Sequence, residues 1–268
     1  MNIIKKLSAI LLAVSMILGS SFVKNADDTY AASTYKKELK LGQTCYYDID
    51  GDGDKDSIKY YVSNEKLMLK VNNTKKVLLD SYSPDCFDIY VRIYDFYKKD
   101  KSVEIVLEWY EYSNWGVKIY KFKNNTCKLS KNYPDALLRN YNSNTGVVTM
   151  ESYDCGNFSS FAKAIGAFGC YEKAKIKGYN VSNDKNVKTT DMVKQNKYKA
   201  AKSLTAYTST NSKKKAFTAK KGSILRVYEL CKVGNSRYIK VKNTSGKYGY
   251  IKVGNSRIFT KDSIIYAR

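Results

Sequence analysis

The stretch Asp48-Ile-Asp-Gly-Asp-Gly-Asp-Lys-Asp56 (DIDGDGDKD) places a carboxylate at every second position of nine residues. The flanking runs, Cys45–Tyr47 and Ile58–Val62, are short and rich in aromatic or β-branched residues, which is typical of strands. Oxygen ligands on alternate residues, wrapped by a sharp turn at Gly53, suit a hard cation such as calcium. A helix–loop–helix site would need a glutamate at the twelfth place, where Lys59 stands. The stretch therefore predicts a calcium loop between two strands.

The predicted calcium ligands are the aspartates of this stretch: Asp48, Asp50, Asp52, Asp54 and Asp56. Asp54 takes the place where the backbone carbonyl usually points at the ion. Clustered carboxylates repel one another, and a bound divalent cation would remove that repulsion. The alternative is an acidic, glycine-rich hairpin that binds no metal.

Short strand-like runs continue after the loop. The clearest ones are 58–62, 67–71, 88–94, 103–107 and 117–122. Asn72-Asn73 and Asn124-Asn125 stand where turns are expected, because asparagine tolerates a positive φ. Regular short strands with turn signals predict an all-β domain over residues 33–178. The run Phe161–Ala167 fits either a strand or a helix.

The pattern D-x-D-x-D-G-x-x-D followed by a strand resembles the calcium loops of FG-GAP and VCBS-type repeats, which form the blades of integrin-like β-propellers. Residues 87–96 and 103–107 resemble a second repeat, whose own loop at 95–100 keeps too few carboxylates. The resemblance spans about residues 33–178 and implies that the calcium is structural. A complete propeller needs at least four blades. The resemblance therefore implies either a propeller-blade-like or a sandwich β domain.

The N-terminus predicts a signal peptide over residues 1–31. Lys5-Lys6 is followed by the apolar run Leu7–Leu18 and by small residues that suit cleavage after Ala31. The run is short for a membrane-spanning helix, and no later stretch is long and apolar enough to span. The prediction is an extracellular or cell-wall-associated protein of Gram-positive type without stable membrane insertion after cleavage. The alternative is an uncleaved anchor.

The six cysteines are Cys45, Cys86, Cys127, Cys155, Cys170 and Cys231. Their even number and the predicted export permit disulfides. Only Cys231 follows residue 179, so it either bridges the domains or at least two thiols stay unpaired. Cys155 and Cys170 flank a predicted hairpin and are the candidate pair. The chain has no CxxC spacing and no histidine, which argues against a structural zinc site.

The positive charge gathers in the last third of the chain. Residues 1–178 hold 26 Lys/Arg and 21 Asp/Glu, a net of +5, whereas residues 179–268 hold 21 and 4, a net of +17. This change marks a domain boundary. Residues 179–200 are polar and lack periodicity, so we predict a linker there and a second domain over 201–262.

The second domain shows strand-like runs at 203–207, 223–228, 237–241 and 248–252, and so few strands would bury a core by closing into a barrel. The stretch of about residues 200–262 resembles bacterial Src-homology-3-like domains. The pieces that carry the resemblance are Leu204–Tyr207, Lys220–Val227, Tyr238–Val241 and Gly246–Ile251. The last piece is similar to the G-x-x-G-W-[IV] ending of that family, with Tyr250 in place of tryptophan. The resemblance implies attachment to peptidoglycan or another cell-wall component, and the charge would draw the domain to anionic wall polymers.

The predicted ligand-binding residues are Tyr207, Tyr238, Tyr248, Tyr250, Lys220 and Lys221. Tyrosine rings offer flat faces to a sugar or a peptide, and the lysines attract phosphate. The alternative is that the tyrosines are half-buried strand residues and the lysines only solubilise. Such a surface would also bind nucleic acid nonspecifically, but the predicted export argues against that as its physiological role.

The lack of histidine removes the usual Ser-His-Asp and Cys-His mechanisms. Glu104, Glu108 and Glu111 could serve glycoside hydrolysis, but the strand pattern predicts solvated or rim positions. The sequence therefore predicts a secreted, non-enzymatic binding protein of the cell wall whose first domain meets a protein or glycan partner. One alternative is an adhesin-like factor for host or cell-surface glycans or proteins. The other is a carboxylate-based wall hydrolase.

Overall fold

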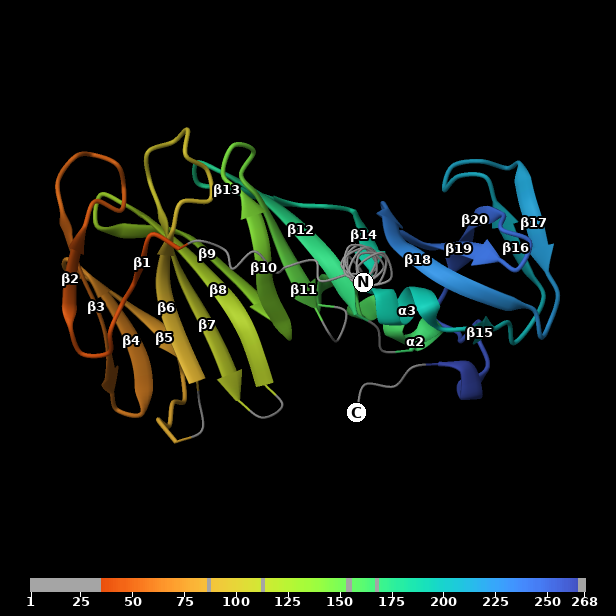
Figure 1. Cartoon of the computed structure of the whole chain (residues 1–268), viewed down its shortest axis with the longest axis horizontal. Helices are drawn as coiled ribbons and strands as arrows, with labels where there is room; N and C mark the ends of the chain where they lie inside the picture. Colours follow the sequence, from red (N-terminus) through yellow and green to blue (C-terminus); the bar gives the residue numbers. More distant parts are fainter. Residues whose placement is uncertain (1–34, 86–87, 112–113, 153–155, 167–168, 265–268) are drawn as a thin grey trace, which may run out of the picture.

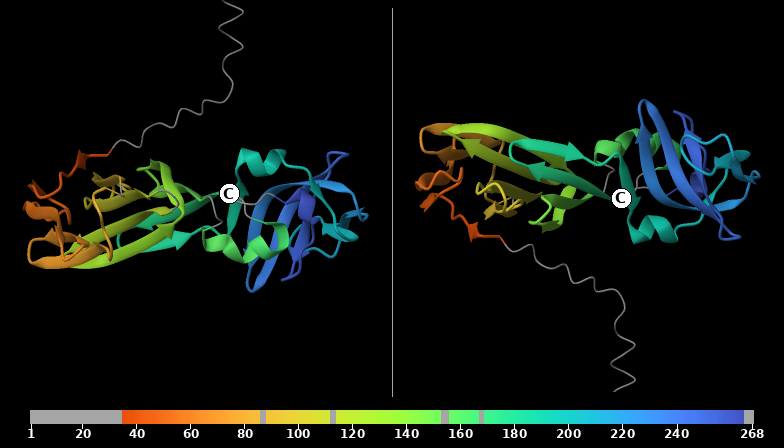
Figure 2. Two further views of the ribbon diagram at one scale, coloured as in Figure 1. Left: turned by 90° about the horizontal axis from the view of Figure 1, so that it is seen from below. Right: turned by 90° about the horizontal axis from the view of Figure 1, so that it is seen from above.

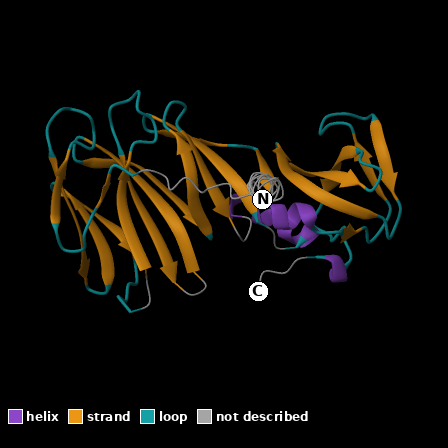
Figure 3. Ribbon diagram, in the orientation of Figure 1, coloured by secondary structure: helices purple, strands orange, loops and turns teal. Residues whose placement is uncertain are grey.

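The computed structural model describes residues 35–85, 88–111, 114–152, 156–166 and 169–264. Within these ranges the chain forms three antiparallel sheets, with a few short helical segments near the middle of the molecule and close to its C-terminus (Figures 1 and 3). The predicted all-β class is confirmed. The predicted signal peptide lies outside the described residues. In the described ranges, no helix has the length and apolar character needed to cross a membrane.

A four-stranded meander carries the acidic loop. Its strands are β2 (Thr44–Tyr47), β3 (Asp56–Ser63), β4 (Lys66–Val71) and β5 (Thr74–Leu79). The loop joins β2 to β3, with Tyr47 opposite Asp56 at its base. Asn72, in the turn between β4 and β5, has a φ of 47°, as its place in the predicted turn requires. The strand–loop–strand setting of the acidic stretch is thus confirmed.

A second sheet has the order β1-β6-β7-β8-β9. Its strands are β1 (Lys37–Glu38), β6 (Asp88–Tyr94), β7 (Glu104–Glu111), β8 (Asn114–Lys123) and β9 (Thr126–Pro134). Asn124 and Asn125 turn the chain from β8 into β9 with φ values of 49° and 58°. Both predicted asparagine turns are therefore present.

The largest sheet has eleven strands, in the order β10-β11-β12-β14-β18-β19-β20-β16-β17, with β13 beside β12 and β15 beside β18. The strands are β10 (Ala136–Asn142), β11 (Val147–Ser152), β12 (Cys170–Lys177), β13 (Asn180–Asn183), β14 (Asn186–Thr189), β15 (Tyr198–Lys199), β16 (Leu204–Tyr207), β17 (Lys215–Ala219), β18 (Ile224–Val233), β19 (Ser236–Asn243) and β20 (Tyr248–Val253). This sheet continues from the middle of the molecule to its C-terminal end (Figure 1).

The first part of the molecule has three layers. One face of the second sheet packs on β2–β5 through side chains such as Ile105 and Leu107 of β7. Its other face packs on β10–β12 through side chains such as Val106 and Ile119. The second sheet is thus the middle layer, and β7 is accordingly buried on both faces from Glu104 to Trp109. The two views in Figure 2 show the elongated outline that results when the C-terminal strands follow these layers.

A separate core fills the C-terminal part. Helical segments contribute to it or flank it: η1 (Gly156–Phe161), α2 (Ala162–Ile165), α3 (Asp191–Gln195) and η2 (Lys261–Ser263). Phe161 and Ile165 are fully buried there beside the strands β18 to β20. The stretch that fitted either a strand or a helix is therefore helical from Phe161 to Ile165.

Residues 179–200 do not form the linker that the sequence predicts. They contain β13, β14, α3 and β15, and two of these strands pair with β18. Val187, Val193 and Tyr198 are buried in the C-terminal core. The segment is polar because most of its other side chains are exposed, and its few apolar residues anchor it.

The C-terminal strands do not close into the predicted barrel within the described residues. One edge of β18 pairs with β19, and its other edge pairs with β14 and β15. These two strands come from residues 179–200 and occupy the edge that a closing strand would need. The strand β17 pairs with β16 and ends the sheet. The layered sheets of the first part likewise form no closed propeller in the described ranges.

Candidate functional site

The structure brings together three of the five predicted calcium ligands. One carboxylate oxygen from each of Asp48, Asp50 and Asp56 lies within 4.8 Å of the other two, and all three residues are half-buried. Asp52 and Asp54 are exposed and do not belong to this cluster. Three converging carboxylates could hold a divalent cation, because calcium takes several oxygen ligands from flexible loops.

Backbone N–H groups orient the clustered carboxylates. Gly51 and Gly53 donate to the two oxygens of Asp48 at 2.8 and 3.1 Å. The N–H of Ile49 donates to Oδ2 of Asp56 at 3.0 Å. The loop therefore holds its acidic side chains in place through its own backbone.

The two asparagine turns lie against the acidic loop. Asn72 donates from Nδ2 to Oδ1 of Asp56 at 2.6 Å and also to the side-chain oxygen of Asn125. The N–H of Asn124 donates to Oδ2 of Asp50 at 2.9 Å. The other oxygen of Asp50, Oδ1, is buried and has no hydrogen-bond partner in the described part of the chain. A buried carboxylate oxygen without a partner is costly, and a cation bound at the cluster would satisfy it.

The acidic loop rests on the loop between β6 and β7. The carbonyl of the buried Ile49 accepts a hydrogen bond from the N–H of Val103 at 3.0 Å. Gly51 has a φ of 77°, and a Cβ at this position would lie 2.9 Å from the backbone of Lys101. Only glycine fits such a close approach with a positive φ. The position of the carboxylates thus depends on the β6–β7 loop.

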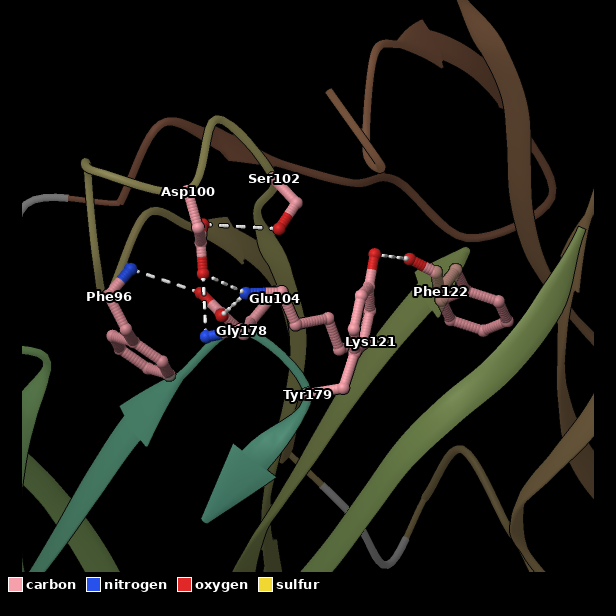
Figure 4. A network of polar contacts seen from close by, with 8 residues as sticks. All are labelled: Phe96, Asp100, Ser102, Glu104, Lys121, Phe122, Gly178 and Tyr179. Carbon is pink, nitrogen blue, oxygen red and sulfur yellow. Dashed lines mark hydrogen bonds and ion pairs between the residues drawn. The ribbon is translucent and has the colours of Figure 1, made fainter. Parts of the chain in front are cut away.

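A buried lysine holds the β6–β7 loop in place (Figure 4). The side chain of Lys121, in β8, has no exposed surface, and its Nζ lies 2.8 Å from both Asp100 Oδ2 and Glu104 Oε1. Asp100 Oδ2 also accepts a hydrogen bond from the N–H of Gly178 at 3.0 Å. Burial alone would lower the pKa of Lys121, but Glu104 and Asp100 more than offset it and raise that pKa. The lysine therefore stays charged inside the fold.

Glu104 and Glu108 do not occupy the solvated or rim positions that the strand pattern predicts. Both are buried between the second sheet and the layer formed by β10–β12. Glu108 Oε1 lies 3.2 Å from the guanidinium of Arg92 and accepts a hydrogen bond from the hydroxyl of Tyr94 at 3.3 Å. Burial raises the pKa of Glu108 more than the attraction of Arg92 lowers it. Glu104 thus balances the buried Lys121 and Glu108 balances the half-buried Arg92, while Glu111 is half-buried at the end of β7.

The four predicted ligand-binding tyrosines lie on one face of the C-terminal sheet. Tyr207 of β16 lies opposite Tyr250 of β20, and Tyr248 is two residues from Tyr250 on the same strand. Tyr238 of β19 lies opposite Lys252 of β20, and Lys252 is two residues beyond Tyr250 on that strand. Opposite residues of an antiparallel pair share a face, as do residues two apart, so all four side chains project to one side. Tyr248 is 45% exposed and the other three are half-buried.

The same face carries many cations and little negative charge. The register places on it Lys188, Lys215, Arg226, Lys240, Lys242 and Lys252. The acidic residue of these strands is Glu229, which binds Lys240 at 3.1 Å. The ammonium groups of Lys240 and Lys242 lie 5.7 and 5.2 Å from the centre of the Tyr248 ring, within cation–π range. We call these cations and the four tyrosines, with Tyr228 packed edge-on against Tyr248, the tyrosine–lysine face.

Lys220 and Lys221 do not join this face. They are exposed in the turn that precedes β18, and the adjacent Gly222 N–H binds the carbonyl of Ala200. Arg226 and the lysines of β19 were not among the residues predicted from the sequence. For the lysines, the signal was the period of two in Arg237-Tyr-Ile-Lys-Val-Lys242, which puts one tyrosine and two lysines on a single side of a strand.

The proposed disulfide between Cys155 and Cys170 stays a prediction, because Cys155 lies outside the described residues, as does Cys86. Cys231 is buried in β18 and has no disulfide partner among the residues that the structure describes. Burial, helped by the nearby Glu229, raises the pKa of the Cys231 thiol to about 11. A thiol with such a pKa is a weak nucleophile at neutral pH.

The resemblances to FG-GAP and VCBS-type repeats and to Src-homology-3-like domains stay predictions. Comparisons of the chain with protein-family models, with curated proteins and with solved structures found no match.

Proposed function

We propose that this is an extracellular, non-enzymatic binding protein that attaches to the bacterial cell wall through its tyrosine–lysine face. The observation that carries the proposal is the composition of that face, where tyrosine rings alternate with cations and Glu229 is already bound to Lys240. Tyrosine rings can stack on sugars or peptides, and the surrounding cations attract phosphate or carboxylate groups. Peptidoglycan and anionic wall polymers offer groups of both kinds.

The net charge of +17 on residues 179–268 adds a long-range attraction to this local chemistry. Such attraction is weakened by salt, whereas contacts with tyrosine rings are not. A specific wall ligand should therefore remain bound at a salt concentration that releases a purely electrostatic one. The predicted signal peptide would bring the face to the compartment where the wall polymers lie.

The test is co-sedimentation of residues 32–268 with purified Gram-positive cell wall at low and at moderate salt. The variant K242Q/K252Q removes two charges from the tyrosine–lysine face, and K220Q/K221Q removes two exposed charges outside it. We expect the first variant to lower the bound fraction well below that of the second. Equal losses, or release of the unaltered protein at moderate salt, would contradict the proposal. Binding to host glycans but not to wall would favour the adhesin-like alternative.

We propose further that the acidic loop binds a structural calcium ion through Asp48, Asp50 and Asp56. The convergence of the three carboxylates and the unpartnered oxygen of Asp50 support this. An ion that binds only the folded chain raises its unfolding temperature. Calcium should therefore raise the Tm of the unaltered protein and of D54N, whose aspartate lies outside the cluster, but not that of D50N. An equal response of both variants would contradict the site.

The layered sheets support a blade-like interpretation of the first part. Three consecutive four-stranded meanders, β2–β5, β6–β9 and β10–β13, stack through two shared cores. Propeller blades are four-stranded antiparallel sheets of this kind. We propose that the three meanders are blade-like repeats of which the first keeps its calcium loop. The C-terminal part would then be an opened relative of the Src-homology-3-like barrel, with β14 and β15 on its closing edge.

A further inference from the structure

A cavity of about 350 Å³ lies at one end of the tyrosine–lysine face. Its polar and charged lining residues are Lys197, Arg226, Lys242, Asn243 and Thr244. Arg226 and Lys242 lie opposite each other on β18 and β19. Lys197 directly precedes Tyr198, which lies opposite Leu225. Three separate segments thus each bring one cation to the cavity.

Among the residues that the structure describes, no acidic side chain forms an ion pair with the three cations of the cavity. Residues 179–268 contain four acidic residues, and three of them bind other lysines: Asp191 binds Lys194, Glu229 binds Lys240, and Asp262 binds Lys199. The fourth, Asp184, lies in the turn between β13 and β14, and no ion pair joins it to the cavity within the described residues. Cations that converge without an anion repel one another.

The donors around the cavity match a tetrahedral oxyanion. The guanidinium of Arg226 is a planar fork that can bind two oxygens at once, and the lysine ammonium groups act as point charges. Asn243, the last residue of β19, and Thr244, in the turn that follows it, add neutral hydrogen-bond donors. The volume exceeds that of a phosphate alone, so there is room for the groups attached to it.

We propose that this cavity binds one phosphate group of an anionic polymer. Lys242 connects the cavity to the aromatic part of the face, because its ammonium group lies 5.2 Å from the centre of the Tyr248 ring. A chain with its phosphate in the cavity would place the next sugar or polyol unit over Tyr248. The identity of the polymer rests on the proposed wall-binding function, whereas phosphate binding by the cavity does not.

The test is a titration of isotope-labelled residues 32–268 with inorganic phosphate, followed by the amide NMR signals at constant ionic strength. We expect the shifts to concentrate at the lining residues. The variant R226Q should raise the Kd for phosphate by about tenfold, as the loss of a charge-assisted hydrogen bond predicts. The control K252Q removes a charge from the same face outside the cavity and should change the Kd by less than about twofold. Unchanged signals outside the cavity would show that R226Q is folded.

Shifts spread over the whole sheet, or an equal loss in K252Q, would overturn the proposal in favour of diffuse attraction. A parallel sedimentation experiment with wall, before and after chemical removal of its phosphate polymers, separates the two proposals. If phosphate binds at the cavity and wall does not pellet the protein, the cavity stands and the wall-binding function fails. If stripped wall binds as well as intact wall and phosphate does not bind, the function stands and the cavity fails.

Discussion

Lys121 illustrates how a single residue can hold a distant loop in place. Its charge is fully enclosed. Asp100 belongs to the β6–β7 loop, on which the acidic loop rests, and Glu104 follows that loop as the first residue of β7. A buried ion pair adds little stability compared with apolar residues of the same size, but removal of one partner leaves the other charge buried and unpaired. Loss of Lys121 would therefore destabilise the fold mainly because it would leave two carboxylates without their cation.

The variant K121M should lose about 3–5 kcal/mol of unfolding free energy at pH 7, because Glu104 and Asp100 would remain without their cation. Burial raises the pKa of Glu104, and the loss of Lys121 removes the strongest effect that opposes it, leaving the hydrogen bond from the N–H of Phe96. The folded variant would then bind a proton more tightly than the unfolded one, so its deficit should shrink as the pH falls toward 5. Urea unfolding at both pH values measures this.

The matched control for this prediction is K123M, which changes an exposed lysine two residues further along β8. Its effect should stay within about 0.5 kcal/mol, as for most surface substitutions. The double variant E104Q/K121M should regain part of the lost stability. A deficit in K121M that equals the one in K123M, or that grows at pH 5, would show that the buried charges are not coupled as described.

The acidic loop was predictable from the sequence because its ligands and its turn glycines lie within nine consecutive residues. The contacts that surround the loop were not predictable from the sequence. Lys121 and Glu104 are 17 residues apart, and Asn72 meets Asp56 from another turn, so their pairing depends on the register of three strands. The positions of Glu104 and Glu108 were predicted wrongly for a different reason. Strand β7 is covered on both faces, so its sequence lacks the alternation that marks a solvated side.

At the scale of elements, the sequence predicted long strands and asparagine turns well and short elements badly. Residues 179–200 contain two-residue and four-residue strands around a five-residue helix. Elements of this length are shorter than the window in which a period can be recognised. The buried Val187, Val193 and Tyr198 therefore looked like isolated apolar residues in a polar segment. Their burial explains why the barrel edge is occupied and the predicted linker is absent.

The helix α3 provides a direct test of this packing. Val193 is fully buried in the C-terminal core, whereas its neighbour Met192 is 58% exposed. V193A should lower the free energy of unfolding by about 2 kcal/mol through lost apolar contacts and a small cavity. M192A removes more atoms from an exposed site and should cost less than about 0.5 kcal/mol. Chemical denaturation of both variants decides the matter, and a segment that acts as a linker would tolerate the two changes equally.

At the scale of the whole molecule, the pattern of strands and turns indicated the all-β class and the charge distribution marked a boundary, but neither indicated the continuity of the large sheet. The shift in net charge near residue 179 suggested two independent domains. In the structure the sheet instead continues from β12 to β14 and on to β18. Phe158 and Phe161, which precede β12 in the chain, belong to the C-terminal core. Such long-range pairing leaves no trace in a local pattern.

The abundance of buried tyrosine predicts a loss of stability in alkali. Burial raises the pKa of Tyr110 and of Tyr133 to about 12, helped by Glu108 and Glu172, whereas an unfolded tyrosine has a pKa of about 10. Between these values the unfolded chain releases tyrosine protons that the folded chain retains, so the free energy of unfolding should fall as pH rises. The raised pKa of Lys121 acts in the same direction.

Urea unfolding at pH 8, 9, 10 and 11 measures this effect. We expect little change up to pH 9 and a steady decline above pH 10. The variant Y133F keeps the ring but removes the ionisable group, so its decline should be shallower. Stability that stays constant to pH 11, or an unchanged slope in Y133F, would show that these tyrosines ionise equally in both states.

The continuity between the two ends of the molecule also has a mechanical consequence. In the described chain, β12 and β14 are joined by two residue pairs, Cys170 with Thr189 and Tyr171 with Lys188. If one end were held on a surface while the other were pulled, tension along the long axis would load this short ladder together with the packing of Phe158 and Phe161 in the C-terminal core. Two residue pairs are held by few hydrogen bonds, so we expect this ladder to open before the longer ladders on either side. The protein would then extend at the β12–β14 pairing under force, while both ends stay folded.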